Sequence, residues 1–455
     1  MRKYYNTIEE FRQLKKEIGF QKDWLLVGVD VAKHNHWAHF ILSNGEEIKK
    51  KYRFSNDRCG FEQFYSIIET LLNQRSIGQV VFGVEPTAGY EKHLSYYLKE
   101  KFYPVVILPT LAVRRNREVL SGTWDKSDYK DASNIAYLLK QGAFQFYHFR
   151  DHKLEEVVRL IRLDETLRNL ECQLKSRFSA HIMPRCFPEL ERVLRSTASR
   201  IYIEFLDHFP TPHAASKISL REMTTVLRDQ FRGSNISAER FAAKVKTIHE
   251  IAQNSIALQR PQLQGDVLEV KLLAQNLRTF REQRKQTNLR IHASLETNKN
   301  YQLLLTIPCI GEKTAALLVV EIGDINRFKH VRQLIKFIGY DLSKNQSGKY
   351  EGPAKMSKRG NARIRRCLWM AMNNACACTR DTNPSIFRQK YLQMMKKRHN
   401  NTHEKRKVKC ALCVKMVRVI WAVLKNQVPY EEKLCQTIGN GNKMQYSANM
   451  EADLS

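Results

Sequence analysis

The sequence predicts a multidomain protein in which an α/β N-terminal domain precedes a longer, mostly α-helical part. A chain of 455 residues is too long for one ordinary hydrophobic core, so two or three folding units are expected. Strand-like apolar runs end near residue 108, and apolar residues spaced at three and four dominate after residue 150. We therefore expect domains over residues 1–150, 151–298 and 299–428, followed by a loose polar tail at 429–455.

The first domain begins with strand patterns. Residues 24–32 (WLLVGVDVA) form a continuous apolar run that is short enough for a buried strand. Asn44-Gly45 lies between two further strand-like runs, at 36–42 and 48–54, and this dipeptide is a strong hairpin signal. We expect three antiparallel strands in sequence.

Helices and strands then alternate. Phe61, Phe64, Ile68 and Leu72 recur at helical spacing, which predicts an amphipathic helix over residues 59–74. The next expected elements are a strand at 80–84, a helix at 90–99, a strand at 105–108, a helix at 111–119 and a final helix from near residue 131. This order is ribonuclease-H-like, and it predicts a mixed sheet with helices on its faces, in which the first and fourth strands are neighbours.

The rest of the chain has helical patterns. A leucine seam predicts a long coiled-coil helix that spaces or pairs subunits, and its members are Leu160, Leu163, Leu167, Leu170 and Leu174. A weaker seam follows near residues 267–277, and Arg281 and Arg284 are expected to interrupt it. Residues 301–328 look like a helix-hairpin-helix, and further amphipathic helices are expected at 361–379 and 408–424.

The charge indicates a polyanionic partner. Lysine and arginine number 76 against 46 acidic residues, a formal net charge of +30. Residues 353–425 alone hold 19 lysines and arginines against two acidic residues, Asp381 and Glu404. Solubility does not require such one-sided charge, so nucleic acid is the expected partner. The N-terminus has no apolar signal core and no run approaches the length of a membrane span, so we expect a cytoplasmic protein.

Four carboxylates fall at positions that suit a metal site. Asp30 lies within the apolar first strand, where a charge is costly without a cation nearby, and Glu85 closes the fourth strand. Asp128 and Asp131 stand three residues apart at a helix start and so share one helix face. Taken singly, a solvated strand end or an N-terminal helix cap would explain each of them. Together they form an arrangement that holds two Mg²⁺ ions for phosphodiester chemistry.

Several motifs resemble a known family. VGVDVAK, GVEPTAGY and KSDYKDASNIAYLL resemble the DEDD motifs of the insertion-sequence 110 transposase family, whose catalytic domain is similar to the Holliday junction resolvase RuvC. IPCIGEKTAA, FKHVRQLIKFIGY and SGKYEGPAKMSKRGNARIRRCLWMA are similar to the C-terminal transposase domain of that family. In two places the chain departs from the pattern: Cys309 replaces a glycine, and Gly339 lacks a proline two or three residues later.

The resemblance implies a composite active site. The four carboxylates would bind Mg²⁺, and Ser347 would match the nucleophilic serine of the family, with Ser343 and Ser357 as nearby alternatives. Ser347 would attack a DNA phosphate and hold the strand as a phosphoserine until it is resealed. The family also implies a prokaryotic protein that acts at the nucleoid as a dimer or tetramer, guided by a noncoding bridge RNA that pairs with target and donor DNA.

Basic side chains near these motifs are expected to contact nucleic acid. Such contacts would position the phosphate backbone without conferring sequence choice. The expected contact residues are Arg114, Arg115, Arg117, Arg159, Arg162, Lys358, Arg359, Arg363, Arg365 and Arg366.

Two other functions are compatible with the sequence. A RuvC-like structure-specific nuclease would use the same carboxylates to activate water, so it would need Asp30 but not Ser347. A noncatalytic nucleic-acid-binding protein derived from a transposase would need neither of these residues.

Overall fold

The computed structural model describes residues 8–20, 24–121, 128–147, 149, 151–193, 200–230, 237–343, 346–347, 350–352, 355–377, 385–396 and 398–431. The chain divides into two compact units, Met1–Phe149 and Arg150–Ser455. Within the described residues, no helix is both long and apolar enough to cross a membrane.

The first unit is built on a mixed sheet with the strand order β3-β2-β1-β4-β5-β6. The parallel neighbours β1, β4 and β5 form its centre, and β2, β3 and β6 pair antiparallel. The predicted pairing of the first and fourth strands is therefore confirmed. The strands are β1 (Trp24–Asp30), β2 (Asn35–Leu42), β3 (Glu47–Ser55), β4 (Gln79–Val84), β5 (Val105–Ile107) and β6 (Gln145–Phe146).

Helices cover both faces of this sheet, consistent with the predicted ribonuclease-H-like fold. One face packs against α2 (Arg58–Gln74) and α3 (Glu91–Glu100). The other packs against α1 (Ile8–Phe20), α4 (Thr110–Ser121) and α5 (Asp128–Lys140). Side chains of successive strand residues therefore belong to two different hydrophobic cores, one on each face of the sheet. The sequence analysis did not predict α1 or β6, because α1 precedes the strand series in a polar stretch and β6 is only two residues long.

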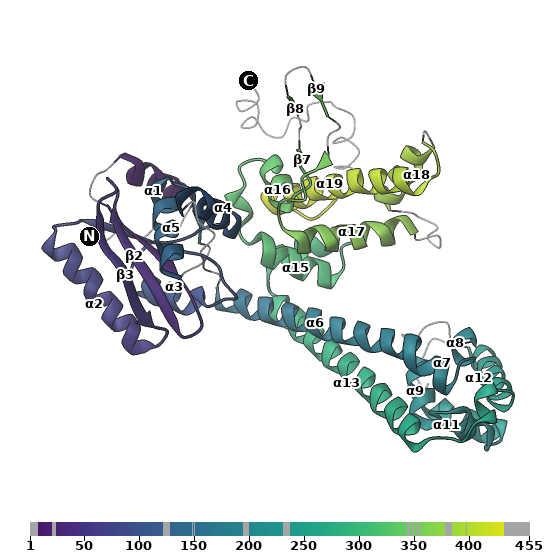
Figure 1. Ribbon diagram of the computed structural model, residues 1–455. Helices are drawn as coiled ribbons and strands as arrows, with labels where there is room; N and C mark the ends of the chain where they lie inside the picture. The colour runs from purple at the N-terminus through teal and green to yellow at the C-terminus, as the bar shows by residue number, and fades with distance from the viewer. Residues whose placement is uncertain are drawn as a thin grey trace. The chain divides into compact units, whose positions relative to one another are not determined.

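The second unit begins with two long antiparallel helices, α6 (His152–Arg177) and α13 (Gln264–Leu295) (Figure 1). In the predicted leucine seam Leu167 is buried, whereas Leu163 and Leu170 are 47% and 39% exposed. A helical lobe joins the two helices around its own core. Its elements are η1 (Phe178–Ile182), α7 (Met183–Cys186), α8 (Leu190–Val193), α9 (Arg200–His208), α10 (Pro212–Ser216), α11 (Leu220–Gln230), α12 (Ala238–Gln253) and η2 (Ile256–Gln259).

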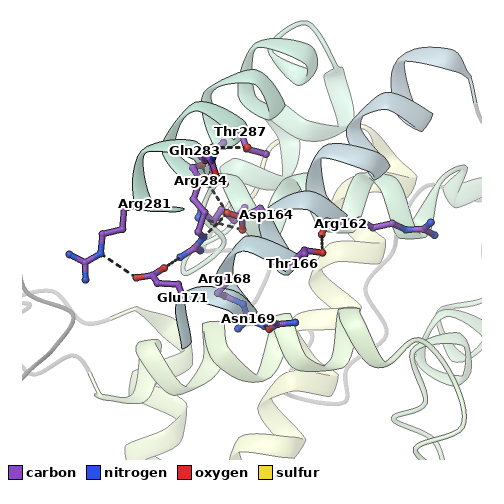
Figure 2. Close-up of polar contacts among 12 residues, drawn as sticks. Arg162, Asp164, Thr166, Arg168, Asn169, Glu171, Arg281, Gln283, Arg284 and Thr287 are labelled. Carbon is purple, nitrogen blue, oxygen red and sulfur yellow. Dashed lines mark hydrogen bonds and ion pairs between the residues drawn. The ribbon is translucent and has the colours of Figure 1, made fainter. Parts of the chain in front are cut away.

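Ion pairs join α6 to α13 at the predicted interruption. Arg281 and Arg284 approach Glu171 at 3.2 and 2.7 Å, and Arg284 also lies 3.0 Å from Asp164 (Figure 2). Helix α13 continues past both arginines to Leu295. The arginines interrupt the apolar seam as predicted, since the next buried apolar residue after Leu277 is Ile291, but they do not end the helix, because carboxylates of α6 neutralise them within the helix contact.

The C-terminal helices pack around a core that they share with the adjoining ends of α6 and α13. Helices α17 and α19 occupy the two predicted ranges, although α19 begins earlier than expected. The turn after α14 holds Cys309 at φ +70°, the left-handed region that favours glycine, and it is the position where the family resemblance led us to expect glycine. The helices are α14 (Lys299–Leu305), α15 (Glu312–Ile322), η3 (Ile325–Arg327), α16 (Val331–Ile338), α17 (Ala362–Ala377), α18 (Ile386–Met395) and α19 (Thr402–Asn426).

Candidate active site

Two of the predicted carboxylates lie at one edge of the central sheet. β1 and β4 are parallel, and their last paired residues are Val29 and Val84. Asp30 ends β1, and Glu85 follows β4 directly. The carboxyl ends of parallel neighbours meet at the same sheet edge, where α/β proteins commonly bind ligands. Both carboxylates are half-buried there, so they remain accessible to a ligand.

A pair of glycines brings α5 close to this edge. Gly28 and Gly83 face each other across β1 and β4. A Cβ atom on Gly28 would lie 2.3 Å from the carbonyl oxygen of Ala132 in α5, so the helix backbone rests on the strand. Side chains alternate between the two faces of a strand, so Asp30 and Glu85 lie on the same face of the sheet as Gly28 and Gly83. Helix α5 covers this glycine-bearing face.

The third carboxylate lies on the helix itself. Asp131 directly precedes Ala132, and only 4% of its surface is exposed. Since Ala132 contacts Gly28, two residues before Asp30, Asp131 belongs to the same corner of the unit. Asp128 begins α5, and its side chain lies outside the described part of the chain. The side chains that are described contain no group of three potential metal ligands close enough to hold an ion.

A buried asparagine that was not predicted from the sequence holds α5 in place. The Asn134 side chain donates to the carbonyl oxygen of Val113 at 2.6 Å and accepts a hydrogen bond from Asn116 at 2.6 Å. Both partners belong to α4, so these bonds tie α4 to α5. Asn134 follows Asp131 by three residues and shares its helix face. One feature of the sequence could have indicated this role. Asn134 is a polar residue within an otherwise apolar helix pattern, and it follows the candidate metal ligand Asp131 by about one helical turn.

Replacing Gly28 with alanine should lower the free energy of unfolding of the first unit by about 3 kcal/mol. The added methyl group would meet the backbone of α5, which cannot rotate away as a side chain can. Gly78→Ala is the matched control, because a Cβ atom there meets nothing within 4 Å. Urea unfolding compares the two variants. Equal stabilities would contradict the close packing of α5 on β1.

The residues expected to contact nucleic acid include some that form internal contacts and some that are exposed. Arg117 cannot be assigned to either group, because its side chain lies outside the described residues. Arg363 lies 3.2 Å from Glu321, and Arg365 donates to the carbonyl oxygen of Ile338 at 2.6 Å, so both stabilise the C-terminal helices. The other expected residues are exposed, and they are Arg114, Arg115, Arg159, Arg162, Lys358, Arg359 and Arg366.

The predicted nucleophile lies in a short ladder between α16 and α17. β8 (Gln346–Ser347) pairs with β9 (Tyr350–Glu351), and the neighbouring β7 (Leu342–Ser343) pairs with β10 (Lys355–Met356). The side chains of Ser343 and Ser347 lie outside the described residues. Ser357, the other alternative, donates its hydroxyl to the carboxylate of Asp341 and its amide to the Asp341 carbonyl oxygen at 2.8 Å. These two bonds close the base of the β7/β10 ladder.

Two family models match the regions that contain these residues. A DEDD transposase model matches residues 27–188, which include all four carboxylates. A model described as the transposase IS116/IS110/IS902 family matches residues 301–391, which include Ser347. The carboxylate-bearing mixed sheet and the helical C-terminal part are thus those of a DEDD transposase. The chain belongs to the IS110 family of insertion-sequence transposases.

Relatives extend the similarity through the middle helices. The insertion element IS110 uncharacterized 43.6 kDa protein of Streptomyces coelicolor is 24% identical over 421 residues, covering 90% of this chain and 96% of the relative. The transposase for insertion sequence element IS1111A of Coxiella burnetii is 30% identical over 141 residues, 31% of this chain and 37% of the relative. The pilin gene-inverting protein of Moraxella bovis is 26% identical over 145 residues, 32% and 42% of the two chains.

Proposed function

We propose that this transposase cuts and rejoins DNA strands through a metal site in its first unit and a serine in its second. The observation that carries the proposal is the glycine-bearing face of the sheet, where Asp30 and Glu85 lie on the side covered by the helix of Asp131. Membership of a transposase family supports DNA as the substrate and transposition as the outcome.

The proposed metal ligands are Asp30, Glu85, Asp128 and Asp131. An all-carboxylate donor set suits Mg²⁺, a hard cation that prefers oxygen, and four carboxylates are enough for two ions. Bound Mg²⁺ would polarise the phosphoryl group and favour ionisation of a nearby hydroxyl. The role of the protein is to hold the carboxylates in place, through the α5 contact at Gly28 and the hydrogen bonds of Asn134.

The proposed chemistry consists of two transesterifications at Ser347. In the first, the serine Oγ forms a bond to a DNA phosphorus, its proton leaves to solvent, and the bond to one sugar oxygen breaks and that oxygen gains a proton. In the second, a sugar hydroxyl of the new partner strand attacks the phosphoserine and restores the serine. Each step exchanges one phosphoester bond for another, so the strand is resealed without an external energy source.

The domain organisation of the chain is compatible with a metal site and a serine that belong to different domains. We propose a catalytic domain at 1–150, a spacing and subunit-pairing region at 151–298 and a serine domain at 299–428. Two duplexes must be cut and exchanged, so the active form is proposed to be a dimer or tetramer. We also propose a noncoding guide RNA on the basis of the family resemblance, and the positive charge of residues 353–425 is compatible with such a polyanion.

A covalent-adduct assay tests the proposed function. The protein is incubated with Mg²⁺, labelled element-end DNA and RNA from the flanks of the element, and denaturing gels then separate protein-bound DNA from free DNA. The wild type and Ser343→Ala should form the adduct, and Ser347→Ala should not. An adduct that persists in Ser347→Ala would reject the serine assignment. Cleavage without any adduct, equal in wild type and Ser347→Ala, would instead support the metal-dependent nuclease.

A further inference from the structure

We propose that a groove between α19 and the β7/β10 ladder binds an unpaired DNA strand and leads it to the segment that carries Ser347. The inference rests on the proposed function and adds a substrate-binding site to it. The groove has a volume of about 810 Å³. One wall is a face of α19, and the other lining residues are Tyr340, Leu342 and Met356.

The charged residues that line the groove come from one face of α19, and none of the described lining residues is acidic. Arg406 and Arg418 form no hydrogen bond or ion pair with any residue that the structure describes. Lys407 lies 2.9 Å from Glu404, a carboxylate outside the groove that Arg398 also contacts. The groove therefore has excess positive charge, and its basic residues are His403, Arg406, Lys407, Lys415 and Arg418.

The length of this face suits a short stretch of nucleic acid. Arg406 and Arg418 are twelve residues apart on α19, which corresponds to about 18 Å along the helix axis. Phosphates of one stacked strand follow each other at about 3.4 Å, so the face spans roughly five of them. Cations at both ends of the face can therefore contact phosphates of the same strand.

Apolar side chains between the cations favour an unpaired strand over a duplex. Leu342 lines the groove and is 65% exposed, so its side chain is available for contact with a bound ligand. Met356 and Val414 line the same groove and are half-buried. The bases of an unpaired strand have free faces that can pack on such apolar side chains, whereas in a duplex the bases are stacked on each other.

The position of the groove favours DNA as its occupant. Leu342 and Met356 belong to β7 and β10, the two strands that enclose the segment containing Ser347. The Ser357–Asp341 hydrogen bonds close this ladder at its base. A strand in the groove therefore lies beside the segment that carries the proposed nucleophile, as the strand to be cut must.

Fluorescence anisotropy with a labelled eight-nucleotide single-stranded DNA tests the groove. The full chain is used, with EDTA present so that no strand is cut. We expect the Arg406→Ala/Arg418→Ala variant to bind at least about tenfold more weakly. The slope of log affinity against log salt should fall by about 1.4, which corresponds to two lost phosphate contacts on a single strand. Duplex DNA is measured in parallel and should lose less affinity, because its bases are stacked on each other. RNA of the same sequence offers the same phosphates and free base faces and should lose affinity to a similar extent.

A matched control variant tests whether the loss of affinity depends on the position of the arginines in the groove or only on the net charge of the protein. Arg240→Ala/Arg290→Ala removes the same charge from exposed positions outside the groove and should change the affinity by less than about twofold. Equal losses in the two double variants would overturn the proposal, as would a loss confined to RNA. Because EDTA prevents cutting, the binding measurement does not depend on the covalent chemistry, so failure of that chemistry would leave this binding result intact. Thermal unfolding confirms that each variant is folded.

Discussion

The Asp30→Asn variant should lose DNA strand cleavage by at least about a thousandfold, which corresponds to about 4 kcal/mol of transition-state stabilisation. Asparagine has nearly the size of aspartate but lacks the charge that a hard divalent cation requires. Asp30 is half-buried at the last position of β1, so the exchange should leave the sheet intact. Glu85→Gln should have a similar effect, because Glu85 lies at the matching position beside β4.

The measurement is the rate of cleavage of element-end DNA over a range of Mg²⁺ concentrations. Asp151→Asn is the control, since Asp151 is exposed and its side chain makes no hydrogen bond to the helix that it precedes. The control should cleave at the wild-type rate. Wild-type cleavage by Asp30→Asn at saturating Mg²⁺ would reject the carboxylate site. Absence of cleavage by every form, wild type included, would favour the noncatalytic DNA-binding protein.

The elements of the first unit could be predicted from the sequence because each leaves a local signature. The apolar run at Trp24–Asp30 and the turn at Asn44-Gly45 depend on neighbouring residues alone, and both appear where expected. The order of elements then restricts the sheet topology, which is why the pairing of β1 with β4 could be inferred. Helix α1 was missed because its helical character depends on burial of Leu14 and Ile18 in a core formed by distant segments.

The candidate site could be predicted only as a set of residue types and positions. The strand ends at Asp30 and Glu85 were visible in the sequence. The reason why α5 approaches them was not, because Gly28 shows its role only when Ala132, more than one hundred residues later, packs against it. The roles of the basic residues could not be predicted for the same reason. The partners of Arg363 and Arg365 lie on other elements, so the sequence around these arginines does not show that they stabilise the fold.

The Glu171→Ala variant should lower the free energy of unfolding of the second unit by about 3 to 5 kcal/mol. Glu171 is 4% exposed and lies in the contact between α6 and α13, beside Arg281 and Arg284 (Figure 2). Lys175 forms a further ion pair with it. Removing the carboxylate leaves these cations close together in a partly buried contact, with Asp164 still paired to Arg284. Glu156→Ala is the control, because Glu156 is exposed on the same helix. Urea unfolding should show little change for the control.

Acid should weaken the same contact in the wild type. Burial alone would raise the pKa of Glu171, but hydrogen bonds from Lys175, Arg284 and Arg281 outweigh burial and lower the pKa from 4.5 to about 2. A carboxylate with a depressed pKa contributes its full stability above the unfolded value of 4.5, and the contribution is lost as the pH falls from there toward about 2. The stability difference between the wild type and Glu171→Ala should therefore be constant at neutral pH and shrink below about pH 4.5. A difference that stays constant down to pH 3 would contradict an ionised Glu171 as the origin of the stabilisation.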